Sequence, residues 1–304
     1  MKRPSDIAKP RTQRHNPAAA ALDTLSAREI ARLINREDAK VAGAVGQALP
    51  AIARAIDAIA AALVRGGRLL YVGAGTSGRI AALDAAECPP TFGTSPRSVQ
   101  YVIAGGRRAL GTAIEVSEDS AALGRRDMSK KRPTKNDVVV GVAASGRTPY
   151  TVAALEFARR RDARTVAVTC NPRSPLARAA HIAIVTPVGP EMVVGSTRMK
   201  AGTAQKMVLN LLSTGAMARL GYVYGNLMVN VDTKNQKLVE RGVAILQQAA
   251  RVPRRSAQRA LKAAGMSVPV ALVMLKAGLG RAAALRRLRQ ARGHVRRALE
   301  ERSQ

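Results

Sequence analysis

The chain has 304 residues, of which 50 are Lys or Arg and 20 are Asp or Glu, so its formal net charge is +30. The most apolar stretch, residues 51–63, is interrupted by Arg54 and Asp57, so no membrane span is expected. The positive charge is spread along the chain, and two Phe, five Tyr and no Trp leave few rings to stack on bases, so nucleic-acid binding is not expected as the main function.

The first 23 residues are polar and aperiodic, so they are expected to form an arm rather than a secretory signal. Ser26 and Glu29 then match a capping box, which predicts a helix that starts just after Ser26. Apolar residues at helical spacing predict a second helix over residues 47–63.

From residue 68 onward, short aliphatic runs alternate with Gly/Ser/Thr-rich turns and helical stretches. Continuous apolar runs of this length are typical of strands buried on both faces, so the pattern predicts an α/β fold with a doubly wound parallel sheet. A long helix rich in Ala, Leu and Met is expected over residues 203–220. The predicted strands are residues 68–72, 99–104, 137–142, 165–169 and 181–186.

The end of the chain, residues 236–304, reads as a small, strongly basic and all-helical unit. It contains a weak repeat, in which a helix is closed by a glycine (Gly265 or Gly293) and followed by another helix. We therefore expect three parts: a polar arm over residues 1–23, a sheet domain with N-terminal helices over residues 24–235, and a helical domain over residues 236–304.

A glycine-rich segment, residues 73–79, directly follows the first predicted strand and opens a helix. The N–H groups and positive dipole end of a helix N-terminus suit a phosphate, and the hydroxyls of Thr76 and Ser77 add donors beside Gly78. The segment also fits the dinucleotide-binding pattern G-x-G-x-x-G. That alternative needs an acidic residue at the end of the next strand, where residues 107–108 are instead an Arg pair that could accept a 2′-phosphate.

A second hydroxyl-rich turn, residues 143–149, follows the third predicted strand. Because the carboxyl ends of parallel strands meet at one edge of a sheet, Ser145, Gly146 and Thr148 can converge with the first loop on a small phosphorylated polyol. The alternative is that Ser145 and Thr148 only cap the helix that follows.

A third segment, residues 195–200, carries the hydroxyls of Ser196 and Thr197 and the ammonium of Lys200, which would also suit a phosphate. The three histidines are far apart in sequence, so no metal site is expected. Two cysteines make no disulfide framework and fit a reducing compartment.

Carboxylates are scarce, so those inside turn-like segments stand out. Glu87 precedes Pro89 and Pro90, which are expected to end the helix and force an extended turn. Glu118 follows in a second polar segment. Two separated carboxyls near a sugar can divide acid and base roles, although either residue could also be an ordinary surface or capping residue.

Residues 73–79, 87–93, 144–150 and 189–206 together resemble the N-acetylmuramic acid 6-phosphate etherase family. The resemblance covers nearly the whole chain after residue 11. It implies a SIS (sugar isomerase) fold, a homodimer and a cytoplasmic enzyme. This chain departs from the family by having Val116 and Ser117 where a small pair such as Gly-Ala is usual, which bears on how Glu118 is aimed.

The resemblance implies a carbon–oxygen lyase of the hydro-lyase type, acting in peptidoglycan recycling without a metal or redox cofactor. It would cleave the D-lactyl ether of N-acetylmuramic acid 6-phosphate to N-acetylglucosamine 6-phosphate and D-lactate. By the family pattern Glu118 is the base at C2, and Glu87 is the acid that protonates the departing lactate. The positions expected to hold the substrate are Thr76, Ser77, Gly78, Ser145, Gly146, Thr148, Ser196, Thr197 and Lys200.

Two other functions fit parts of the sequence. A non-catalytic sugar-phosphate sensor on the same fold would keep the hydroxyl-rich loops and need neither glutamate, so the presence of both Glu87 and Glu118 favours the enzyme. A regulator that also binds DNA would need a helix-turn-helix segment, and the N-terminal helices lack a convincing one.

Overall fold

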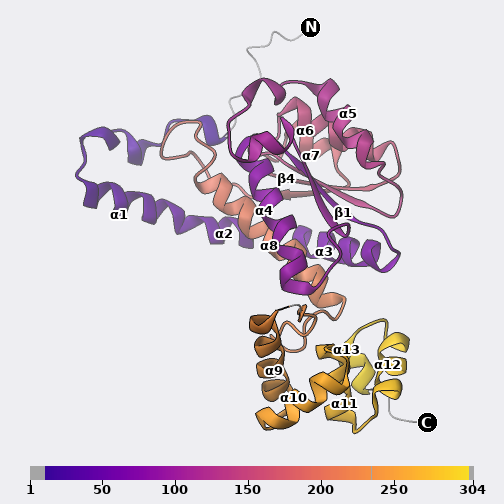
Figure 1. Ribbon diagram of the computed structural model, residues 1–304. Coiled ribbons are helices and arrows are strands. Elements are labelled where there is room, and N and C mark those ends of the chain that lie inside the picture. Colours follow the sequence, from indigo (N-terminus) through magenta and orange to yellow (C-terminus); the bar gives the residue numbers. More distant parts are fainter. Residues whose placement is uncertain (1–10, 234, 301–304) are drawn as a thin grey trace. The chain divides into compact units, whose positions relative to one another are not determined.

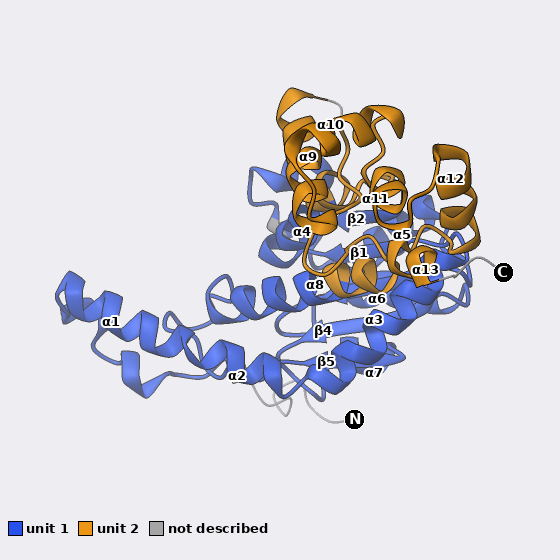
Figure 2. Cartoon of the chain, turned by 90° about the horizontal axis from the view of Figure 1, so that it is seen from below, with its two compact units in different colours: residues 1–85, 97–212 blue, residues 86–96, 213–304 orange. Residues whose placement is uncertain are grey.

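The computed structural model describes residues 11–233 and 235–300 (Figure 1). The chain divides into two compact units, residues 1–85 with 97–212 and residues 86–96 with 213–304 (Figure 2). The first ten residues of the predicted arm lie outside the described residues, and the part that follows forms short 3-10 turns. The predicted domain limits at residues 24 and 236 stay predictions.

The first unit is built on a five-stranded parallel sheet with the strand order β2-β1-β3-β4-β5. Every residue of β1 and β3 is buried, as expected for central strands covered on both faces. The five predicted strands and the α/β class are confirmed. The strands are β1 (Leu69–Gly73), β2 (Val99–Ile103), β3 (Val138–Val142), β4 (Arg164–Thr169) and β5 (Ile182–Val185).

Helices cover both faces of this sheet (Figure 1). On one face Leu70 and Val139 share a buried cluster with Tyr150 and Leu155 of α6. On the other face the Tyr71 hydroxyl donates a hydrogen bond of 2.8 Å to a carboxylate oxygen of Asp84 on α4. The helices are α1 (Ala27–Asp38), α2 (Lys40–Gly46), α3 (Leu49–Val64), α4 (Gly75–Phe92), α5 (Ala121–Lys131), α6 (Pro149–Arg159), α7 (Pro175–Ala179) and α8 (Lys200–Arg219).

Most helix boundaries follow their local signals. The capping box of Ser26 and Glu29 is present in full, and α1 starts at the next residue, Ala27. The predicted helix over residues 47–63 is confirmed as α3. Helix α8 starts three residues earlier than predicted, at Lys200.

The prediction that Pro89 and Pro90 end a helix is wrong. Helix α4 continues through both prolines to Phe92. Proline fixes φ near the helical value, so it is compatible with the helix. Pro89 and Pro90 lack the N–H groups that would bond one turn back, but they stand close to the end of α4. Gly93, with φ +62°, then closes the helix, and its N–H donates a 2.8 Å hydrogen bond to the Pro89 carbonyl.

The second unit is helical along the end of the chain, and its helices pack around a shared aliphatic core that includes Val243, Leu261 and Leu272. The weak repeat predicted there corresponds to two helix pairs, joined at Gly265 (φ +66°) and Gly293 (φ +82°). The helices are α9 (Gln236–Ala250), α10 (Arg254–Ala263), α11 (Val268–Ala277), α12 (Arg281–Gln290) and α13 (Val295–Glu300).

Within the described parts of the chain, no single helix is long and apolar enough to cross a membrane. Two strongly bent helix pairs reach that length and hydropathy only when the helices of each pair are counted together.

A buried carboxylate joins the starts of the two central strands. Asp137, which is 2% exposed, precedes β3 and accepts hydrogen bonds from the Arg68 backbone N–H (2.8 Å) and guanidinium Nη2 (2.8 Å) before β1. It also accepts the Thr134 N–H at 2.9 Å. Burial raises the pKa of the Asp137 carboxyl, but the bonds from Arg68 and Thr134 outweigh this and hold it below its ordinary value.

We expect Asp137→Ala to lower the free energy of unfolding by about 3 kcal/mol or more, because it leaves a part-buried guanidinium and two backbone N–H groups without their acceptor. The exposed Asp23 provides a control, and Asp23→Ala should cost less than about 0.5 kcal/mol. Since the folded-state pKa is depressed, the contribution of Asp137 is present above the ordinary carboxyl pKa and is lost as pH falls below about 4. Urea unfolding at pH 7 and pH 3 measures both effects, and equal losses for the two variants at pH 7 would contradict this role.

Candidate functional site

The order of the strands places two hydroxyl-rich loops side by side. From β1 the chain crosses to β2 on one side of the sheet, whereas from β3 it crosses to β4 on the other side. The loops after β1 and β3 therefore flank the point where the winding reverses, which is where open α/β sheets bind ligands. These are the two loops that the sequence singles out.

The first loop, residues 73–78, turns tightly into α4. A Cβ on Gly73 would lie 2.9 Å from the Gly78 backbone nitrogen, and Gly75 has φ +51°, so both positions require glycine. Thr76 and Ser77 stand half-buried in the first turn of α4. The first N–H groups of a helix have no acceptors inside the helix, so this turn offers donors toward the edge of the sheet.

Glu118 contacts the first loop and the start of α6, the helix that follows the second loop. A Cβ on Gly75 would lie only 2.7 Å from Glu118 Oε1, so the carboxylate rests against the bare Cα of the first loop. The Glu118 backbone carbonyl accepts a 3.1 Å hydrogen bond from the N–H of Tyr150, in the first turn of α6 after the second loop. The carboxylate of Glu118 thus lies against the first loop, while its backbone is tied to the helix that follows the second.

The second loop is rigid and leaves a hydroxyl uncommitted to the helix. Gly146, with φ +65°, packs so closely that a Cβ would lie 2.3 Å from Ser174 Oγ. The Asn171 amide donates to the carbonyls of Ala144 (3.1 Å) and Ser145 (3.2 Å). Thr148 precedes α6 but makes no side-chain capping hydrogen bond, so the alternative that it only caps the helix is wrong.

The Ser145 hydroxyl can also donate a hydrogen bond. Its Oγ accepts the Arg147 N–H at 3.1 Å, which uses a lone pair and not the hydroxyl proton. The loop therefore presents hydroxyl donors at the N-terminus of α6, where the helix dipole favours an anion.

The third hydroxyl-rich segment meets the first loop through α8. A Cβ on Gly202 would lie 3.5 Å from the Thr197 carbonyl oxygen and 3.6 Å from Thr76 Cγ2. Thr197 and Thr76 therefore both approach the same point on the first turn of α8. Ser196 stands next to Thr197, and its N–H donates to the Val193 carbonyl at 2.9 Å.

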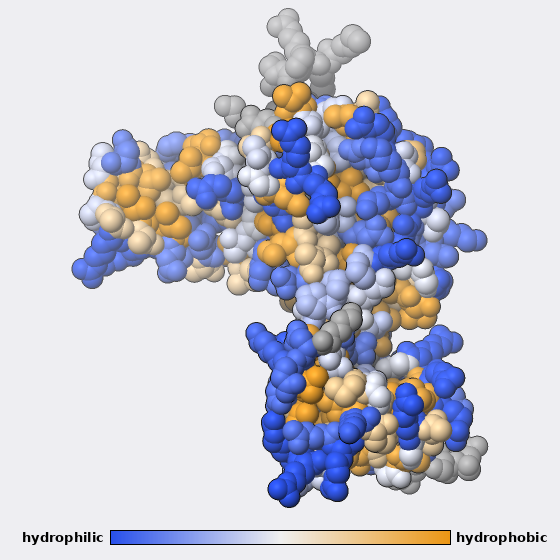
Figure 3. Space-filling model, in the orientation of Figure 1, coloured by the Kyte–Doolittle hydropathy of each residue, from blue (hydrophilic) through white to orange (hydrophobic). Residues whose placement is uncertain are grey.

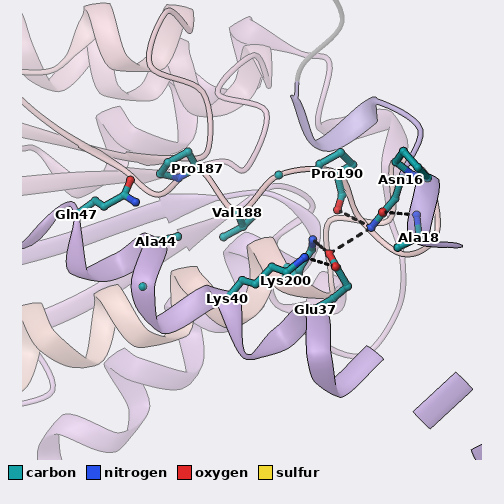
Figure 4. Close-up of a pocket in the computed structure, with 13 residues that line it drawn as sticks. Asn16, Ala18, Glu37, Lys40, Ala44, Gln47, Pro187, Val188, Pro190 and Lys200 are labelled. Carbon is teal, nitrogen blue, oxygen red and sulfur yellow. Dashed lines mark hydrogen bonds and ion pairs between the residues drawn. The ribbon is translucent and has the colours of Figure 1, made fainter. Parts of the chain in front are cut away.

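Lys200 has a different partner from the one expected. Its side chain is 1% exposed, and Nζ forms a 2.7 Å ion pair with Glu37 of α1 (Figure 4). Asn16 donates to the same carboxylate oxygen at 3.3 Å, and the exposed Lys40 bonds to the other one. Burial raises the pKa of Glu37, but the bonds from Lys200 and Lys40 outweigh it and lower the pKa to about 2. This group forms one wall of a pocket of about 640 Å³ between α1–α2 and residues 187–190.

Glu191 is a residue whose role sequence reasoning missed. It is fully buried, and its carboxylate accepts the N–H groups of Lys200 (3.1 Å) and Ala201 (2.9 Å) at the start of α8. Burial raises its pKa, against the lowering effect of these two bonds. The sequence signal for this role is a lone acidic residue ahead of the Gly-Ser-Thr turn. A carboxylate at that place is stabilised by a helix N-terminus, so it indicates a helix that starts at Lys200.

Glu87 belongs to a different compact unit from the loops. It is exposed on α4 and belongs to the second unit, whereas Glu118 and all three hydroxyl-rich segments belong to the first. The first unit thus brings Glu118 together with the loops and does not include Glu87.

The residues that the structure describes contain no cluster of three His, Cys, Asp or Glu side chains that could hold a metal. Cys88 and Cys170 are buried and unpaired with each other. Burial raises the pKa of the Cys170 thiol to about 11, which makes it a poor nucleophile.

We expect Lys200→Met to lower the free energy of unfolding by about 3–5 kcal/mol, because it strands a buried Glu37 carboxylate. Lys40→Met is the matched control: it removes an exposed cation from the same carboxylate and should cost less than about 1 kcal/mol. Because the folded-state pKa of Glu37 is depressed to about 2, its stabilising contribution should be lost as pH falls from about 4.5 toward 2. Urea denaturation across that range tests this, and similar losses for both lysines would argue against a buried pair.

Two family models match parts of the chain. Residues 51–159 match the glucokinase regulatory protein N-terminal SIS domain, and residues 113–215 match the SIS domain. A solved structure of phosphoheptose isomerase from Francisella tularensis is similar with a TM-score of 0.52 and 18% identity, over 64% of this chain and 100% of that one. This likeness supports the fold alone.

Relatives of nearly the same length are much closer in sequence. The N-acetylmuramic acid 6-phosphate etherase of Aeromonas hydrophila is 52% identical, over 95% of this chain and 97% of its own. That of Klebsiella aerogenes is 50% identical, over 97% of this chain and 98% of its own. The similarity extends over both units and not only over the sheet, and the chain belongs to the N-acetylmuramic acid 6-phosphate etherase family.

Proposed function

We propose that this chain is a carbon–oxygen lyase of the hydro-lyase type that cleaves the D-lactyl ether of N-acetylmuramic acid 6-phosphate. Its products are N-acetylglucosamine 6-phosphate and D-lactate, in the recycling of cell-wall peptidoglycan. The observation that carries the proposal is the carboxylate of Glu118, which lies against Gly75 in the first loop while the Glu118 backbone carbonyl bonds to the start of α6, the helix that follows the second loop. The names of the relatives supply the substrate.

The reaction needs a base and an acid. In the open-chain sugar the C1 aldehyde acidifies the C2–H bond, and a carboxylate beside C2 takes that proton to form an enolate. The enolate expels lactate from C3 as the C3–O bond breaks, and an acid protonates the departing oxygen. Water then adds to C3 of the unsaturated aldehyde, and C2 is reprotonated. In this proposal Glu118 is the base and Glu87 is the acid.

The charge of Glu118 supports placing the phosphate in the second loop. Two like charges 4 Å apart repel by roughly 4 kcal/mol at an effective dielectric constant of 20, so a phosphate dianion against Gly75 would be opposed by Glu118. Ser145 and Thr148 offer hydroxyls at the N-terminus of α6, where the helix dipole favours an anion. Adjacent strands lie about 4.8 Å apart, so a sugar whose phosphate is bound after β3 can present C2 and C3 to the loop after β1.

The remaining predicted positions fit the sugar end of this arrangement. Thr76, Ser77 and Gly78 line the first loop beside Glu118, and Thr197 is next to Thr76 across Gly202. We assign these groups, together with Ser196, to the sugar hydroxyls and the N-acetyl group. The ammonium of Lys200 is paired with Glu37, so we assign Lys200 no direct contact with the substrate. Its contribution is to hold the start of α8 in place.

The sensor alternative is not favoured. A sugar-phosphate sensor would need the two loops but no carboxylate between them, and the relatives at about half identity are named as etherases.

We further propose that the chain acts as a homodimer in the cytoplasm. Apolar side chains are exposed over α1 in Figure 3, and Val193 and Val194 in the segment before α8 are 52% and 54% exposed. Exposed apolar patches mark association surfaces, and a second copy would cover them. The two reduced cysteines fit a reducing compartment.

We expect Glu118→Gln and Glu87→Gln each to lower lactate release by about 10²–10⁴-fold. The two variants should differ in the exchange of the C2 proton with solvent. Glu118→Gln should also abolish exchange of the C2 proton with D₂O, whereas Glu87→Gln should retain it, since proton removal precedes loss of lactate. The exposed Glu156 on α6 is the control, and Glu156→Gln should behave as wild type. Full lactate release by both variants would overturn the proposed mechanism.

We expect Thr148→Val to raise the KM for the sugar phosphate by about 10-fold or more with a small change in kcat, because a hydrogen bond to a charged group contributes about 1.5–3 kcal/mol. Thr151→Val, in the first turn of the helix that Thr148 precedes, is the matched control, because the Thr151 hydroxyl is buried and has no hydrogen-bond partner among the described residues. Competitive inhibition by inorganic phosphate should weaken in parallel. Unchanged KM and phosphate inhibition in Thr148→Val would move the phosphate away from this loop.

A further inference from the structure

Arg79 binds the chain segment that leads to Glu118. Its Nε donates a 2.8 Å hydrogen bond to the Ala109 carbonyl, and its Nη2 donates a 3.0 Å bond to the Thr112 carbonyl. Arg79 belongs to the glycine-rich motif after β1, where an arginine would ordinarily be read as a phosphate ligand. Here its planar group is aimed at two backbone carbonyls.

The two attachment points share one face of α4. Gly75, which Glu118 touches, and Arg79 are four residues apart, and residues at that spacing lie one above the other on a helix. The segment from Ala109 to Glu118 therefore runs along α4 and is held at both ends: by the guanidinium of Arg79 at one end and by the Gly75 contact at the other. The Tyr150 N–H fixes the Glu118 backbone from the opposite side.

Apolar packing gives this segment little additional support. Val116 is 89% exposed and does not anchor the segment, and Leu110 is only partly covered. Ile114 packs on the bare backbone of Gly105, where a Cβ would lie 3.1 Å from it, and Ala109 is buried. With so few apolar contacts, the two charge-assisted bonds from Arg79 are a main restraint on the path of the chain into Glu118.

We propose that Arg79 is a positioning residue that sets the place of the Glu118 carboxylate, and that it does not bind the substrate phosphate. This inference rests on the proposed function, in which Glu118 is the base at C2. A base must lie within hydrogen-bond reach of the proton it removes, and a displacement of about 1 Å can cost 10²-fold in rate. Arg79 thereby links the first loop to the base that works beside it.

The test is a comparison of steady-state kinetics and C2 deuterium exchange for wild type, Arg79→Ala, Arg79→Lys and Arg159→Ala. Arg159 is the matched control, since it also donates to two backbone carbonyls, those of Arg178 (3.4 Å) and Ala179 (3.3 Å), in the same unit but in contact with α7. Arg79→Ala should lower kcat and C2 exchange together by about 10²-fold, while KM stays within about threefold of wild type. Arg79→Lys should recover part of the rate, because an ammonium can reach one carbonyl but not both in the same geometry.

The outcomes separate the possible roles. A KM raised tenfold or more with kcat unchanged would mean that Arg79 binds the phosphate and would overturn the inference. Equal effects of Arg79→Ala and Arg159→Ala on rate and melting temperature would reduce Arg79 to a structural residue, which would also overturn it. An inactive wild type would instead refute the proposed function, so the two failures are distinguishable.

Discussion

The site depends on the reversal of strand order between β1 and β3. A parallel sheet must carry its crossovers on its faces, and here the crossover from β1 goes one way while that from β3 goes the other. The two loops are therefore free of an overlying connection, and both open at the same edge. The buried bonds between Asp137 and Arg68 fix the opposite ends of the same two strands, so the distance between the loops is set by backbone pairing and not by the loops themselves.

Glu118 is the carboxylate that the proposed function places at this edge. It directly follows a single 3-10 turn, Glu115–Ser117, its side chain contacts the first loop, and its carbonyl bonds to the helix after the second. Under the proposed function, a group held in this way would connect phosphate binding after β3 with the placement of the base. The bonds from Arg79 add a restraint on the same chain segment from the first loop.

Local signals in the sequence predicted the strands, the α1 cap and the three hydroxyl-rich segments, because aliphatic runs, capping residues and glycines act over a few neighbouring positions. The errors concern partners that are distant in sequence. Lys200 pairs with Glu37, 163 positions away, and nothing near Lys200 distinguishes a buried ion pair from a phosphate ligand. Pro89 and Pro90 were read as a helix end, although proline φ is compatible with a helix and Gly93 supplies the actual stop. The bonds from Arg79 are accepted by backbone carbonyls, and since every residue type has a carbonyl, the sequence does not identify these partners.

The chain has few carboxylates, and this makes its surface strongly positive. The buried acidic residues within the described ranges are Glu37, Asp84, Asp137 and Glu191, and each accepts a hydrogen bond. With 50 Lys and Arg against 20 Asp and Glu, the chain has a large excess of basic residues, and strongly hydrophilic side chains cover α9 and α10 in Figure 3. A positive surface raises the local concentration of an anionic substrate, but salt screens this attraction beyond about 8 Å at physiological ionic strength. Under the proposed function the basic surface therefore increases the encounter rate of a sugar phosphate, while the loop hydroxyls and Glu118 are the groups assigned to select it.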